Sequence, residues 1–225
     1  GFYQGKEKLP RFAVALMPHT VHAVKAFAVV RPENIGQDMQ CAVIAQVIDK
    51  LEAGGAERVL VSLSNILQEH NHEVKVITTV NPGPLALQLN EGIEQVCLYR
   101  KWKYNPVTMY KLVKQLRDCN VVHVHSYYNL LYLFTAKTLF GLRGRIFFHE
   151  HYGARTGEKT GLFKSYMLRK IIFIGVSEKL CKWAIETAGA PKKKVFLLPN
   201  IIQKQNLNAV QMRDKTFVQL LIVSN

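Results

Sequence analysis

Hydrophobic and polar positions change period several times along this chain, and each change predicts a boundary between a strand and a helix. Residues 41–48 form an apolar run rich in β-branched side chains, which is typical of a strand buried on both faces. Residues 49–55 interrupt the run and end in Gly54 and Gly55. From Ala56 onward, apolar residues recur at helical spacing. The stretch therefore predicts a strand, a glycine-rich turn and a helix, in that order.

The same alternation continues through most of the chain. The further predicted strands are residues 74–79, 93–99, 121–125, 145–148, 171–176 and 195–198. The further predicted helices are residues 106–116, 128–140, 162–169 and 178–188. Strands that alternate with helices of this length are typical of βαβ units, so the sequence predicts an α/β fold with a parallel sheet.

The two ends of the chain differ from this pattern. Residues 1–38 are interpreted as an N-terminal appendage, because the first convincing strand follows them directly. Residues 39–202 are predicted to form one domain. Residues 203–225 combine a polar linker with the apolar run 217–223, which is interpreted as the first strand of a missing C-terminal domain.

Composition and charge narrow the choice of partner and compartment. Of the 225 residues, 48% are hydrophobic, which is ample for a packed core. Lys and Arg number 30 against 16 Asp and Glu, so an anionic partner is expected: an acidic membrane, a phosphorylated substrate or nucleic acid. Four scattered cysteines indicate a reducing, cytoplasmic setting.

Basic residues mix with aromatic ones in two stretches, residues 99–117 and 163–170. This mixture suits peripheral contact with an acidic membrane, such as the inner face of the cytoplasmic membrane. A solvated helix face explains each stretch equally well. Nucleic acid is the weakest interpretation, and none is expected as a partner, because the chain contains no recognition module.

The glycine-rich turn of residues 49–55 stands where open α/β sheets bind phosphorylated ligands, at the carboxyl end of a strand and before a helix. It is not the dinucleotide fingerprint, since G-x-G-x-x-G is missing. The alternative is a turn that needs glycine only for its backbone angles. From this stretch alone, the two interpretations stay open.

Four histidines form two H-x-H pairs at the ends of two predicted strands. The pairs are His123 with His125 and His149 with His151, and a spacing of two places each pair on one strand face. Gathered imidazoles can bind zinc, so a metal-dependent hydrolase is an alternative function. No Asp accompanies the pairs at a metal-ligand spacing, and His123 is expected to pack within the sheet.

Five motifs, taken in order, resemble those of group 1 glycosyltransferases, family four. They are IDKLEAGGAERVL, VVHVHSYYN, FFHEHYG, IGVSEKLCKW and VFLLPNIIQ. The resemblance implies a Rossmann-like, doubly wound parallel sheet that forms the N-terminal half of a two-domain GT-B enzyme. It also implies a retaining transfer from a nucleotide sugar to a lipid-linked or polysaccharide acceptor, of the kind found in lipopolysaccharide synthesis. No metal or other cofactor is implied.

The resemblance also identifies candidate site residues. His149 is the expected catalytic residue, with a ring bonded to a loop carbonyl as the alternative. The expected substrate-binding residues belong to the same motifs: Gly54, Gly55, Glu57, Ser126, Tyr127, Glu150, His151, Ser177 and Asn200. Glu57 also suits the positive end of a helix, and Ser177 suits a helix cap. A binding module without catalysis is a further alternative.

Overall fold

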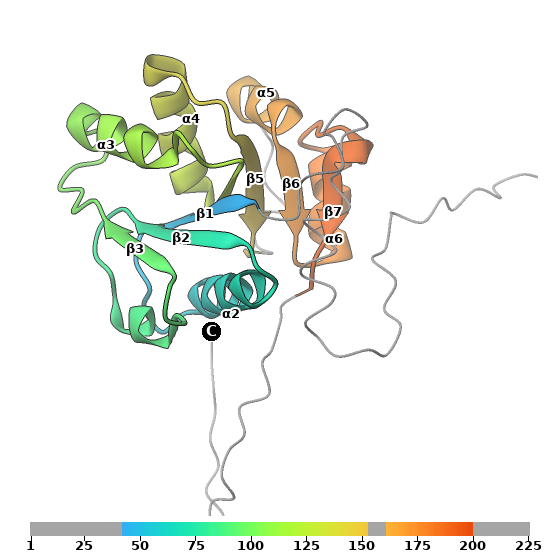
Figure 1. Ribbon diagram of the computed structural model, residues 1–225. Helices are drawn as coiled ribbons and strands as arrows, with labels where there is room; N and C mark the ends of the chain where they lie inside the picture. The colour runs from blue at the N-terminus through green and yellow to red at the C-terminus, as the bar shows by residue number, and fades with distance from the viewer. Residues whose placement is uncertain (1–41, 153–160, 200–225) are drawn as a thin grey trace, which may run out of the picture.

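Seven parallel strands form one sheet in the computed structural model, which describes residues 42–152 and 161–199 (Figure 1). The strands are β1 Val43–Ile48, β2 Glu73–Thr78, β3 Glu94–Cys97, β4 Val121–His125, β5 Arg145–Glu150, β6 Ile172–Gly175 and β7 Val195–Leu197. Their order across the sheet is β3-β2-β1-β4-β5-β6-β7, and every neighbouring pair is parallel. The predicted α/β fold with a parallel sheet is confirmed.

Helices connect the strands and cover both faces of the sheet. They are α2 Gly55–Glu69, α3 Pro106–Leu116, α4 Tyr127–Phe140, α5 Leu162–Lys170 and α6 Glu178–Glu186, with short 3-10 turns η1 Pro84–Gln88 and η3 Lys192–Lys194. Each helix and strand predicted within the described residues is present within a few residues of its expected bounds. The two 3-10 turns were not predicted, because proline and lysine at these positions are equally typical of loops.

The core divides according to the two faces. On one face, α2 packs against β1 and β2 through residues such as Leu60, Leu63 and Val76. On the other, α3, α4 and α6 pack against residues such as Val122 and Phe148. The sheet is therefore doubly wound, as predicted, because the chain runs outward from β1 in one direction and outward from β4 in the other.

This winding defines the position of the candidate site. The direction of the chain reverses between the neighbouring strands β1 and β4, so the loops that follow them diverge and leave a crevice at the carboxyl ends of the strands. We call this side of the sheet the carboxyl edge and the opposite side the amino edge. The register pairs His125 of β4 with His149 of β5 near the carboxyl edge.

The predictions for the two ends of the chain stay untested. The appendage at residues 1–38, the linker and the strand at 217–223 all lie outside the described residues. Asn200 also lies outside them.

Candidate functional site

A network of polar side chains links the strand ends beside the crevice. Asp49 follows β1 and accepts hydrogen bonds from Thr79 Oγ1 at 2.6 Å and from Arg100 Nη2 at 2.8 Å. Arg100 also donates to the Tyr128 hydroxyl, and its guanidinium lies 5.1 Å from the centre of the Tyr132 ring. The network therefore fixes the loops after β1, β2 and β3 against the first turn of α4.

Two basic residues that the sequence assigned to surface stretches are in fact buried. The Arg100 side chain is only 8% exposed, since the Asp49 carboxylate and the aromatic rings of α4 enclose it. Lys164 is 9% exposed, and its ammonium lies 4.8 Å from the Tyr127 ring and 4.7 Å from the Trp183 ring. For Lys164 a signal existed, because it precedes buried Met167 and Leu168 at helical spacing. For Arg100, only its tertiary partners explain the burial.

The glycine-rich turn has ordinary backbone geometry. Gly54 is the N-cap of α2 with φ of −97°, and Gly55 begins the helix, so neither occupies the left-handed region that favours glycine. A Cβ on Gly55 would meet no atom within 4 Å, whereas one on Gly54 would lie 2.1 Å from the Glu57 carboxylate. The interpretation that glycine serves only the backbone angles of this turn is therefore wrong. The space beside Gly55 is open, whereas the Glu57 carboxylate lies against Gly54.

Ser126 holds the start of α4 in a strained conformation. Its φ is +83°, which is rare for a residue with a side chain, and its Oγ accepts a hydrogen bond from the Asn129 backbone at 3.4 Å. Strain of this kind is common at functional sites. The neighbouring Tyr127 is half-buried and packs over Lys164. The structure thus places both predicted residues at the carboxyl edge, directly after His125.

The four histidines of the H-x-H pairs form one cluster. The rings of His123 and His125 lie 4.4 Å apart between centres, and those of His149 and His151 lie 4.1 Å apart. Across the two strands, His125 Nδ1 lies 3.0 Å from His151 Nε2, and His125 Nε2 lies 2.9 Å from the side-chain amide oxygen Oε1 of Gln46. Because that oxygen can only accept, His125 donates from Nε2 and, when neutral, accepts at Nδ1 from His151.

Three of these imidazoles are neutral. His123, His125 and His149 are fully buried, and burial is the main cause that holds each pKa well below 6.5. The other histidines of the cluster lower these pKa values further, since a second positive charge nearby is unfavourable. For His149 the backbone of Leu198 opposes the shift without reversing it.

His149 lies deeper than the sequence predicted. The strand β5 continues through Glu150, so His149 is inside the strand and has no exposed surface. Neither of its ring nitrogens has a protein partner at hydrogen-bond geometry, although Leu198 is close enough to influence its pKa. His151 is only half-buried and stands between His149 and the edge. An unpaired buried imidazole is costly, by about 1–3 kcal/mol, which makes His149 a candidate for contact with a ligand.

The same cluster could hold a metal ion. Ligand nitrogens of His123, His125 and His149 all lie within 4.8 Å of one another. A tetrahedral zinc ion needs nitrogens about 3.4 Å apart, given bonds of about 2.0–2.1 Å. Both nitrogens of His125 also have hydrogen-bond partners already, so metal binding would require a rearrangement. The hydrogen bond between His125 and His151 needs no such change, and the absence of a metal stays a prediction.

The remaining predicted residues have clear positions. Glu150 is 1% exposed, and its Oε1 accepts a hydrogen bond from the Tyr152 backbone at 3.1 Å. Ser177 caps α6, since its Oγ accepts from the Leu180 backbone at 3.3 Å, which confirms its expected role as a helix cap. Glu57 lies in the first turn of α2, where the helix dipole favours its charge. Among the described residues, no helix is long and apolar enough to cross a membrane.

A doubly wound α/β domain with a glycine-rich turn and buried histidines at its carboxyl edge is typical of enzymes that bind sugars or nucleotides. The chain belongs to glycosyltransferase family 4, because the model of that family matches residues 53–205. This match confirms the resemblance carried by the five motifs. A search of curated proteins finds no match.

Two solved structures share the fold. Anabaena Alr3699/HepE, crystallised with UDP and glucose, is 15% identical with a TM-score of 0.55, over 71% of this chain and 44% of that one. The lipopolysaccharide outer core galactosyltransferase WaaB, in its apo form, is 15% identical with a TM-score of 0.51, over 75% of this chain and 47% of that one. At this identity the likeness shows the fold alone, which is that of GT-B glycosyltransferases. The chain spans less than half the length of these structures.

Proposed function

We propose that this chain is the acceptor-binding half of a retaining glycosyltransferase that uses a nucleotide sugar. In the reaction, the bond between the anomeric carbon of the sugar and the diphosphate breaks, and a bond to an acceptor hydroxyl forms. The hydroxyl proton is released, and the nucleoside diphosphate leaves. The observation that carries this proposal is the neutral histidine cluster at the same sheet edge as the open glycine-rich turn, in a chain of family 4.

The geometry supports distinct roles for the two parts of the edge. A side chain at Gly55 would begin in open space, so a ligand can approach the first turn of α2, where backbone N–H groups and the helix dipole favour a phosphate or a sugar hydroxyl; the Glu57 carboxylate lies beside them against Gly54. We propose that the half-buried His151, together with His149 behind it, hydrogen-bonds the sugar or the acceptor; the two rings lie 4.1 Å apart between centres. A neutral imidazole suits this task, because it can donate and accept without adding charge beside a charged donor. The diphosphate itself would be held mainly by the second half of the enzyme.

The donor and the acceptor are proposed as chemical classes. A nucleoside diphosphate sugar is the proposed donor, supported by the structure of Alr3699/HepE with UDP and glucose. A lipid-linked or polysaccharide acceptor is proposed, with lipopolysaccharide as one case, supported by the fold shared with WaaB. We place the reaction in the cytoplasm, with peripheral contact at the inner membrane face, and we propose no metal or other cofactor.

The test measures nucleotide release and sugar transfer with a protein that contains both halves. Purified protein should release nucleoside diphosphate from a nucleotide sugar only when a lipid-linked or glycan acceptor is added, and a chelator should leave the rate unchanged. The 225-residue chain alone should show no transfer, because in this proposal the second half of the enzyme holds the diphosphate. Rapid turnover by the chain alone would contradict the two-domain proposal.

A metal-dependent hydrolase is the second candidate, and the approach of three imidazoles within 4.8 Å is the observation in its favour. Metal analysis of protein purified without added metal separates the two. A stoichiometric transition metal together with loss of activity on chelation would favour hydrolysis. A binding module without catalysis would instead bind the acceptor but release no nucleotide from any donor.

A further inference from the structure

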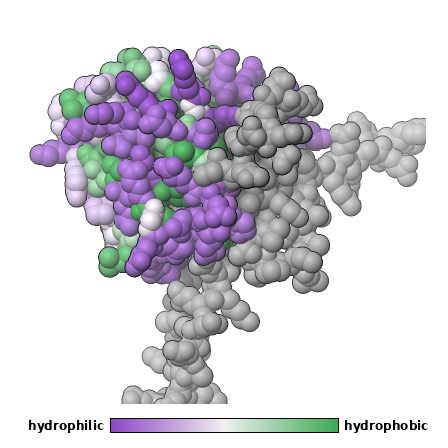
Figure 2. Space-filling model, viewed as in Figure 1, coloured by the Kyte–Doolittle hydropathy of each residue, from purple (hydrophilic) through white to green (hydrophobic). Residues whose placement is uncertain are grey.

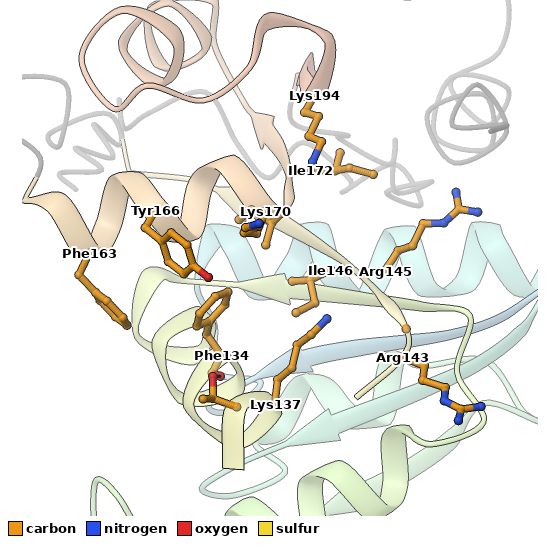
Figure 3. Close-up of a pocket in the computed structure, with 13 residues that line it drawn as sticks. Phe134, Lys137, Arg143, Arg145, Ile146, Phe163, Tyr166, Lys170, Ile172 and Lys194 are labelled. Carbon is orange, nitrogen blue, oxygen red and sulfur yellow. Dashed lines mark hydrogen bonds between the residues drawn. The ribbon is translucent and has the colours of Figure 1, made fainter. Parts of the chain in front are cut away.

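A second cavity lies at the opposite edge of the sheet from the histidines. It has a volume of about 790 Å³ and opens between α4 and α5, beside the first residues of β5, β6 and β7 (Figure 3). Its walls are formed by helix ends and strand starts, so it belongs to the amino edge. Since neither the glycine-rich turn nor any histidine lines it, the cavity is separate from the candidate transfer site.

Five cationic side chains surround this cavity: Lys137, Arg143, Arg145, Lys170 and Lys194. None of the described residues that line it is acidic. Part of this charge has a local explanation, because Lys137 and Lys170 stand in the last turns of α4 and α5, where the helix dipole favours a cation. Two helix ends supply together only about one negative charge. Arg145 has a further interaction within the protein, but the four remaining cations still exceed that charge, so the cavity attracts anions.

Aromatic rings form the wall between the two helices. The Phe134 ring meets Phe163 at 6.2 Å and Tyr166 at 6.1 Å between centres, both edge to face (Figure 3). Phe163 and Tyr166 stay more than half exposed, at 54% and 52%. Rings held in this way present a firm apolar surface directly beside the cations.

The helix α4 extends this apolar surface. It is mostly apolar and has no separate polar face, a pattern that is typical of a buried helix, yet Leu139 is 60% and Phe140 is 38% exposed at its end. Figure 2 shows apolar residues over α4 at the top of the molecule, next to strongly polar ones. A purely solvated face would not place apolar side chains here, so the surface is suited to an amphiphilic partner.

We propose that this cavity binds the phosphate group of an anionic phospholipid, with the acyl part lying against Phe134, Phe163 and the end of α4. Phosphate matches the surplus of cations, and its lipid tail matches the exposed rings. The amino edge would then face the bilayer. The strands β4, β5 and β6, of four to six residues, separate the two edges by about 13–20 Å, given a rise of about 3.3 Å per residue. This consequence rests on the proposed function: if the carboxyl edge carries out the transfer, the acceptor hydroxyl reacts at about that distance from the lipid headgroups.

The test compares two triple variants with equal loss of charge. The first replaces Lys137, Arg143 and Lys170 by Ser, which spares Lys194, whose Nζ bonds the Arg169 carbonyl at 3.1 Å. The control replaces Lys101, Lys111 and Lys114, exposed residues around a groove of about 510 Å³ between β3 and α3. Binding to vesicles of phosphatidylcholine with phosphatidylglycerol should weaken about 100-fold in the first variant and only a few-fold in the control. Equal weakening in the two variants would mean that the vesicles attract only the net charge of the protein, and it would overturn the proposal.

A second comparison separates lipid from free phosphate. A soluble short-chain phosphatidylglycerol, below its micelle concentration, should bind the unmodified protein. Phe163→Ser should weaken that binding with only a small decrease in the melting temperature, because Phe163 is more than half exposed and loses mainly its contact with Phe134. Inorganic phosphate should bind far more weakly and should not respond to Phe163→Ser. Equal affinity for inorganic phosphate and the short-chain lipid would overturn the lipid assignment. Transfer to a soluble acceptor should be unchanged in all three variants, so failure here leaves the proposed function standing.

Discussion

The two edges of one sheet differ in how they carry their polar groups. At the carboxyl edge, His123, His125 and His149 are fully buried and neutral, and burial holds their pKa values low. At the amino edge, five cations surround a cavity beside half-exposed aromatic rings. Buried polar groups are mostly neutral, because a charge without a partner costs free energy in the interior, whereas water solvates a charge at the surface. The carboxyl edge is thus suited to a sugar, and the amino edge to an anion at a surface.

Ion pairs follow the same division. At the carboxyl edge, Arg100 and Asp49 are 2.8 Å apart, and the arginine is 8% exposed. Near the amino edge, Lys75 and Glu94 are 3.0 Å apart, but the glutamate is 53% exposed. Water screens the second pair far more than the first. Four experiments test this contrast, and they are ordered here by the size of the expected effect.

Acidification should destabilise the protein through the carboxyl edge. The unfolded chain takes up protons on these histidines near pH 6.5, whereas the folded chain takes them up only at much lower pH. Stability is therefore fully present above pH 6.5 and is lost as the pH falls. Each of the three histidines contributes up to about 1.4 kcal/mol per pH unit, so the loss reaches about 4 kcal/mol per unit.

Denaturant unfolding at several pH values measures this loss, and NMR identifies its source. The ring C–H signals of the three histidines should not titrate between about pH 5.5 and 8 in the folded protein. A buried ring that titrates with a pKa near 6.5 would contradict the assignment of neutral imidazoles.

Replacing His149 should reduce catalysis in the enzyme that contains both halves. We expect His149→Ala to lower kcat by about 100-fold, the usual scale for a positioned catalytic group. The less disruptive variant His149→Asn limits the loss of packing and should show a similar decrease. Steady-state kinetics with a melting curve for each variant make the comparison. The control is His70→Ala, at the far end of α2, and full activity of stable His149 variants would refute the proposed role.

Removing one charge from each ion pair should show the difference in screening. Asp49→Asn leaves the buried Arg100 without its counter-charge and should cost about 1–3 kcal/mol of unfolding free energy. Glu94→Gln at the exposed pair should cost less than about 1 kcal/mol. Urea denaturation of both variants measures the two free energies. A larger loss for Glu94→Gln than for Asp49→Asn would contradict the expected difference between the buried and the exposed pair.

The smallest effect is expected at the glycine-rich turn. A side chain on Gly55 meets nothing in the protein and needs no unusual backbone angle, so Gly55→Val should change stability by less than about 1 kcal/mol. If a ligand approaches here, activity should nevertheless fall about tenfold or more, because the branched side chain occupies its space. Unchanged kinetics in a stable Gly55→Val enzyme would show that the turn is not part of the ligand-binding site.

The sequence by itself determined the fold and much of the carboxyl edge. Strand and helix periods repeat locally, so they specified the parallel sheet, and the H-x-H spacing placed His123 and His125 on one strand face. The motif order identified the family, as the match over residues 53–205 confirms. These features depend on near neighbours in the chain, and local sequence records them directly.

Tertiary structure alone decided which polar residues are buried and where cavities form. Arg100 belongs to a basic, aromatic-rich stretch, and only contacts with distant rings and with Asp49 bring it inside. The pairing of His125 with His149 depends on strand register across 24 residues, which no local pattern specifies. The amino-edge cavity gathers the ends of α4, α5 and three strands. Burial and cavity shape are set by long-range packing, because the same side chain is stable in water or in a core according to what surrounds it.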